Sequence, residues 1–143
     1  MKIKKDWVGK LPSTDEIHND SKLWLSEISF IKDEIRFLNH LLSSNYIDFL
    51  STGMRKKIDT LVKKIDDEKK IGNILFKEIK HHERTLYNLI ETKQFSNKTN
   101  FIETHKKFER EIFIYSKKYK KLKRNIFKIV EDIMRKKEQK ILL

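Results

Sequence analysis

The chain has 143 residues, a length that fits one domain with its own hydrophobic core. It contains only three glycines and one proline, and these few turn formers exclude an all-β fold, which needs many turns. The absence of cysteine excludes disulfides, thiolate nucleophiles and cysteine-ligated metal centres. The formal net charge of +12 favours a polyanionic partner. However, the composition is rich in Lys and free of Ala, as AT-rich coding sequences are, and this alone would raise the charge.

The first 12 residues are basic and predict an irregular N-terminal arm. No apolar run follows them, so they do not resemble a secretory signal. No stretch of the chain approaches the ~20 apolar residues that a membrane span requires. We therefore expect a cytoplasmic protein without a transmembrane segment.

A first helix is predicted over residues 13–50. Ser13 and Glu16 have the spacing of a capping box, which marks a helix start. Apolar residues then recur at alternating steps of four and three, as in helices packed with nearly parallel axes; they are Trp24, Ile28, Ile31, Ile35, Leu38 and Leu42, with Phe49 further on. A second apolar stripe beside them predicts contact with a second helix; it comprises Leu23, Phe30, Phe37 and Leu41.

Two further helices are predicted, over residues 54–93 and 98–140, with seams of the same spacing. The second seam includes three unusual members, Glu68, Gly72 and His82, and the glycine indicates either a close helix approach or a bend. Short loops make sequential helices antiparallel. The sequence thus predicts an all-α domain over residues 13–143, an elongated antiparallel three-helix bundle with coiled-coil-like packing. Leftover apolar residues could support dimerisation; they include Phe113, Ile114, Phe127 and Val130.

A histidine–carboxylate cluster is the first candidate site. Helix bundles bind metals through His and Glu side chains that project inward from facing helices. The candidate ligands are His18, Glu78, His82, Glu83, His105 and Glu109. Counting from turns centred near residues 51 and 96 places His18, His82 and Glu109 at nearly one level, with His105 about 5 to 7 residues away. The alternative is that these are half-buried seam histidines with ordinary hydrogen bonds, while His40 and His81 lie off the seams and face solvent.

The residues around this cluster resemble a family of uncharacterised small bacterial helical proteins. The similar segments are His18 with the later Trp-Leu-Ser-Glu of residues 24–27, the Ile-Lys-His-His-Glu of residues 79–83, and His105. The family pattern reads H-x-x-H before a W-L-x-E-L helix, then H-x-x-x-H-E and a final His. Two positions depart from it, because Ser21 and Glu78 stand where the pattern has His. The family has no established activity, and the resemblance adds only modest support to a divalent metal such as Fe, Zn or Mn in the histidine–carboxylate cluster. Glu78 could preserve ligation, whereas Ser21 could not.

A basic segment of the third predicted helix is the second candidate site. Lys117, Lys121, Arg124 and Lys128 recur at steps of four, three and four, so they form one stripe along a helix. Such a stripe could follow a phosphate backbone, and its predominance of Lys indicates non-specific attraction rather than base reading. The alternative is an ordinary solvated helix face.

Glu27 and Glu34 interrupt an apolar stripe and are the third candidate. They are either functional carboxylates or partners of Lys on a neighbouring helix, and the second interpretation is favoured. No nucleophile elbow or glycine-rich phosphate loop is present, and a narrow bundle has little concave volume, so an enzyme is not expected. The sequence therefore predicts a non-enzymatic interaction or scaffolding protein, with a protein partner, self-association or an anionic surface as its contact. A metal-binding bundle is the alternative.

Overall fold

The computed structural model describes residues 13–94 and 99–142, and these residues form four α-helices. They are α1 (Thr14–Ser44), α2 (Tyr46–Ser51), α3 (Arg55–Glu91) and α4 (Thr99–Leu142). The predicted all-α class is confirmed, whereas the predicted basic arm lies outside the described residues. Across the described ranges, no helix carries an apolar stretch long enough to cross a bilayer.

The first predicted helix is divided at Asn45, so its expected continuity to residue 50 was wrong. The side chain of Ser44 donates to the carbonyl oxygen of His40 at 2.8 Å, and the Asn45 side-chain amide donates to that of Leu41 at 2.8 Å. These side chains satisfy carbonyl groups that backbone amides of a continuing helix would otherwise bind. The start was predicted correctly, because Ser13 and Glu16 form the complete capping box.

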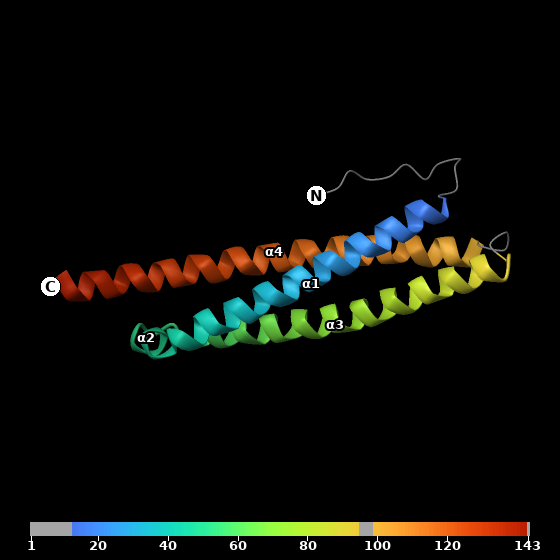
Figure 1. Cartoon of the computed structure of the whole chain (residues 1–143). Helices are drawn as coiled ribbons and strands as arrows, with labels where there is room; N and C mark the ends of the chain where they lie inside the picture. Colours follow the sequence, from blue (N-terminus) through green and yellow to red (C-terminus); the bar gives the residue numbers. More distant parts are fainter. Residues whose placement is uncertain (1–12, 95–98, 143) are drawn as a thin grey trace.

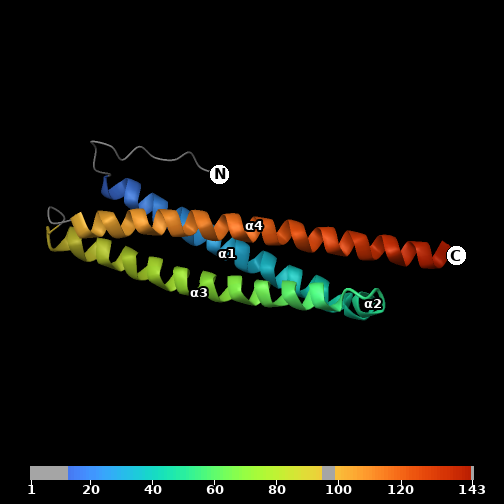
Figure 2. The same cartoon turned by 180° about the vertical axis from the view of Figure 1, so that it is seen from behind.

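The three long helices lie side by side, with α3 running opposite to α1 and α4 (Figure 1). Helix α1 crosses one face of the α3–α4 pair obliquely, and Figure 2 shows it behind them from the other side. It packs more extensively on α3 than on α4. The short α2 lies at the end of the bundle where α1 ends and α3 begins. The C-terminal part of α4 extends beyond α2 (Figure 1).

The core consists of the predicted seams, which are almost entirely buried. One large cluster runs from Trp24 to Phe49 on α1 and α2 and takes in the facing residues of α3 and α4. A smaller cluster closes the end at which α1 and α4 begin; it comprises Ile17, Leu86, Phe101 and Ile102, with Leu89 packed against it. Between the two clusters lies a polar layer that includes His82, His105 and Asp20.

Gly72 marks a close approach of α3 and α4 rather than a bend. A Cβ atom at this position would lie 2.5 Å from the hydroxyl oxygen of Tyr115 on α4. Any larger side chain would therefore collide with a buried ring. This steric need accounts for a glycine in the middle of a 37-residue helix.

The second apolar stripe of α1 is largely exposed, whereas burial against a second helix was expected. Leu23, Phe30 and Phe37 are 50%, 60% and 58% exposed, and only Leu41 is half-buried against the core. Helix α1 turns its Ile and Trp seam toward α3 and α4, which leaves the neighbouring stripe at the surface. Of the apolar residues expected to be left over on α4, Phe113, Ile114 and Phe127 are exposed, whereas Val130 is buried in the core.

Candidate functional site

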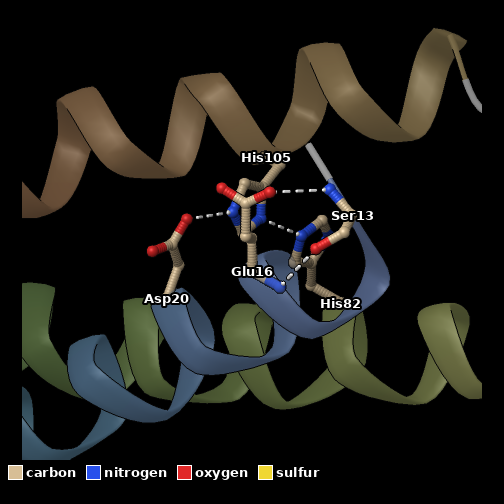
Figure 3. Close-up of polar contacts among 5 residues, drawn as sticks. All are labelled: Ser13, Glu16, Asp20, His82 and His105. Carbon is tan, nitrogen blue, oxygen red and sulfur yellow. Dashed lines mark hydrogen bonds and ion pairs between the residues drawn. The ribbon is translucent and has the colours of Figure 1, made fainter. Parts of the chain in front are cut away.

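Three helices bring Asp20, His105 and His82 into one buried hydrogen-bonded chain (Figure 3). Asp20 comes from α1, His82 from α3 and His105 from α4, and each is no more than 5% exposed. The His105 Nε2 atom lies 3.1 Å from Asp20 Oδ2, and His105 Nδ1 lies 2.8 Å from His82 Nε2. His105 is therefore the central member, with one ring nitrogen directed at each neighbour.

The direction of these hydrogen bonds follows from the chemistry of the groups. An ionised carboxylate can only accept, so His105 Nε2 donates to Asp20. A neutral His105 then has a free lone pair on Nδ1, which accepts from His82 Nε2. This arrangement leaves His82 Nδ1 as an acceptor at the end of the chain.

Aromatic rings pack against the two buried histidines. The Phe101 ring stacks on His82 with centroids 4.2 Å apart, and the Trp24 ring lies 4.6 Å from that of His105. Burial in this environment, together with the nearby His105 and His81, lowers the pKa of His82 to about 4. His82 is therefore neutral at pH 7.

A second pair, at nearby sequence positions of α1 and α3, lies near the hydrogen-bonded chain. His18 Nδ1 and Glu83 Oε2 are 2.5 Å apart, which joins α1 to α3. The second carboxylate oxygen of Glu83 and the hydroxyl of Ser21 are both buried, and within residues 13–94 and 99–142 neither has a hydrogen-bond partner. Buried polar atoms normally have one, so this end of the bundle has unused capacity for hydrogen bonding or ligation.

The predicted ligands are only partly brought together. His82 and His105 are in direct contact, and His18 and Glu83 form a pair of their own. Glu78 is exposed and lines a surface hollow of about 630 Å³ together with His81 and His82. Among the described residues, no group of three or more His, Asp or Glu side chains is arranged to hold a metal ion.

The predicted register of α4 was off by more than one turn. His105 is opposite His82, where Glu109 had been expected; Glu109 follows one turn later on α4 and is half-buried. The counting assumed a turn centred near residue 96, whereas the contact between residues 82 and 105 implies one closer to the end of α3. The error arose because the sequence between residues 92 and 98 has no helical spacing from which the position of the turn could be counted.

Asp20 is the member of the site that the candidate list omitted. It stands four residues before Trp24, a seam position, so the signal was a carboxylate at core spacing. The next residue, Ser21, stands where the family pattern has His, and its hydroxyl is also buried. Periodicity alone does not reveal which of several polar residues near a helix start faces inward.

The basic stripe of α4 is on the surface, as its spacing predicted. Lys117, Lys121, Arg124 and Lys128 are all exposed. Their neighbour Lys123 instead turns toward α1, where its amino group donates to both carboxylate oxygens of Glu34 at 2.7 and 3.0 Å. The stripe thus remains available to an external anion.

The carboxylates Glu27 and Glu34 join α1 to α4, and the expected Lys partner is found for Glu34, whereas Glu27 bonds to a serine. Ser116 donates to Glu27 at 2.8 Å, and Tyr119 donates to Glu34 at 2.8 Å. Burial by itself would raise the pKa of Glu34, but the hydrogen bonds from Lys123 and Tyr119 outweigh it, and the pKa lies below its ordinary value. Glu34 is therefore ionised near neutral pH.

Searches of protein families, curated proteins and solved structures find no match to the chain.

Proposed function

We propose that the chain is a non-enzymatic interaction protein, a coiled-coil-like bundle of three long helices that presents a cationic stripe to a polyanionic partner. The observation that carries the proposal is the exposure of all four members of the stripe on one face of α4. Residues 117–128 span about 17 Å of helix axis, a length comparable to five phosphates of one nucleic-acid strand.

The chemistry of the stripe favours attraction without sequence reading. Three of its four members are Lys, which acts as a point charge, whereas base recognition is typical of Arg, Asn and Gln. Each phosphate contact releases condensed counterions, so the affinity should fall steeply with salt.

The test is a binding series against duplex DNA, RNA and anionic vesicles at two salt concentrations. Lys121→Glu combined with Arg124→Glu is expected to weaken binding at least about ten-fold and to reduce the salt slope. The matched control is Lys63→Glu with Lys64→Glu, which makes the same charge change at exposed positions of α3. The proposal fails if the two double variants bind all three anions equally well.

A second candidate function, metal binding, is supported by the orientation of His105. Histidine ligands commonly donate their second ring nitrogen to a carboxylate, which fixes the ring and raises its basicity, and Asp20 stands in that position. His82 is neutral at pH 7, and its Nδ1 lone pair takes no part in the hydrogen-bonded chain, so it is the nitrogen that could bind a divalent ion such as Fe, Zn or Mn. His105 Nδ1 could join it only by giving up its hydrogen bond with His82. The buried oxygen of Glu83 that lacks a partner within the described residues would be a further donor at this end.

Metal analysis of protein purified without a His-tag tests this candidate. About one equivalent of metal, with a rise in Tm when metal is added, is the expected result. His82→Gln should abolish both effects, while His81→Gln, at the exposed neighbouring position, should leave them intact. Metal below about a tenth of an equivalent, together with an unchanged Tm, would eliminate the candidate.

A further inference from the structure

An exposed apolar face follows the line along which α1 meets α4. Its members on α1 are Leu23, Phe30 and Phe37, which are 50%, 60% and 58% exposed, and those on α4 are Phe113 and Phe127, each 43% exposed. We call this set the α1/α4 face.

The contacts between the helices place these residues side by side. Glu27 meets Ser116 and Glu34 meets Lys123, in both cases with a sequence separation of 89, so α1 and α4 run in parallel at a fixed offset. At this offset Leu23 lies within one residue of the level of Phe113, and Phe37 within one residue of the level of Phe127. Phe113 precedes Ser116 by three residues and Phe127 follows Lys123 by four, which puts both rings on the side of α4 nearest α1.

The exposed apolar area is large for a chain of this size. With about 200 Å² for each complete side chain, the five exposed fractions amount to roughly 500 Å². Apolar patches of this extent on a monomer usually mark an interaction site. Two copies joined through this face would bury about 1,000 Å² from these residues alone, which reaches the lower bound for a specific interface.

The charges on the two helices identify a second copy of the chain as the occupant. Helix α1 contains six acidic and three basic residues, whereas α4 contains fourteen basic and six acidic residues. Asp20, Glu27 and Glu34 already bond to α4 of their own chain, so what distinguishes the two helices is their net charge, −3 on α1 and +8 on α4. Contact between unlike helices is therefore favoured when α1 of each copy lies on α4 of the other.

The same charges select the symmetry. A two-fold axis parallel to the helices places α1 over α4 of the second copy, with Phe37 of one chain against Phe127 of the other. A two-fold axis across the helices would instead place α4 over α4 and set two strongly basic helices together. We propose that the chain forms a parallel two-fold dimer through the α1/α4 face, with α1 and α4 of both copies as a four-helix core.

Molar mass in solution tests the dimer. Light scattering over a concentration series should give twice the 17.4 kDa of the chain. Phe30→Ser with Phe37→Ser should give 17.4 kDa with an unchanged circular dichroism spectrum, because both rings are exposed in the monomer. Val62→Ser with Ile74→Ser, which removes exposed apolar side chains from α3 instead, should remain dimeric. A monomeric wild type, a dimeric α1 variant or a monomeric α3 variant would each overturn the proposal.

Cross-linking tests the orientation, since the chain has no cysteine of its own. A mixture of one chain with Phe37→Cys and another with Phe127→Cys should be joined by a short bis-maleimide reagent. Phe30→Cys alone should give no cross-linked dimer, because the parallel two-fold keeps the two α1 helices apart. Efficient cross-linking of Phe30→Cys to itself, or none between the mixed chains, would refute the arrangement.

Discussion

His82 is held uncharged between Phe101 and His105, and this determines how the fold should respond to acid. Its pKa is about 4 in the folded chain, against an ordinary value of 6.5. Between these two values the unfolded chain binds a proton that the folded chain does not, so stability falls as the pH falls. Below about pH 4 His82 is protonated in both states, so the stability gained by keeping it neutral is lost completely and falls no further.

We therefore predict that lowering the pH from 7 to 5 reduces the free energy of unfolding by about 2 kcal/mol through His82. Chemical denaturation at a series of pH values would measure it. His82→Gln should flatten the dependence, whereas His81→Gln at the surface should not. Glu68 acts in the opposite direction, because burial raises its pKa and the folded chain therefore binds its proton more readily than the unfolded chain. The measured fall in the free energy of unfolding is the effect of His82 minus that of Glu68. An equally steep curve for His82→Gln would contradict the assignment.

At the scale of single residues, the sequence revealed the buried histidines but not their partners. His82 and His105 occupy seam positions, and their burial follows from periodicity. Their contact depends on the length and path of the loop before α4, which no residue pattern specifies. Asp20 is buried because α1 turns that edge toward α4, a consequence of tertiary packing that helical spacing alone does not determine.

At the scale of elements, helix starts and seams were predictable, whereas the break at Asn45 and the exposure of one stripe were not. Ser13 and Glu16 form a local signal that works without tertiary context. The seam through Trp24 and Leu38 is apolar at every step and is buried, whereas the stripe containing Phe30 and Phe37 is interrupted by carboxylates and is exposed, which its apolar members alone did not reveal. Which of the two stripes is buried depends on how many helices share the core.

The contact between α3 and α4 at Gly72 yields a prediction at this scale. Gly72→Ala would gain about 1 kcal/mol of helix propensity in isolation, but its methyl group would meet the Tyr115 hydroxyl at 2.5 Å. We expect a net loss of about 1 to 3 kcal/mol, as is typical of overpacking, measured by urea denaturation.

The matched test is Gly72→Ala combined with Tyr115→Phe, which removes the oxygen that the methyl group meets. The double variant should be more stable than Gly72→Ala alone and show clear non-additivity in a double-mutant cycle. Additive effects would mean that the glycine serves some purpose other than this approach.

At the scale of the whole molecule, the polar layer divides the core into two unequal parts. The larger cluster extends over most of the length, and the smaller one has Ile17, Leu86, Phe101 and Ile102 at the end where α1 and α4 begin. Few apolar contacts hold that end, and the layer beside it contains the buried Ser21 hydroxyl and Glu83 oxygen, which lack partners within the described ranges. Local opening should therefore begin there.

Hydrogen exchange followed by mass spectrometry would measure this difference. Amides of residues 17–21 and 86–89 should exchange through openings that cost at least about 2 kcal/mol less than those of residues 65–75, which belong to the larger cluster. The direction follows from the number of buried apolar side chains on each side of the layer, not from helix length, because α3 runs unbroken through both. Protection that is uniform along α3 would show that the histidine layer couples the two clusters into one cooperative unit instead of separating them.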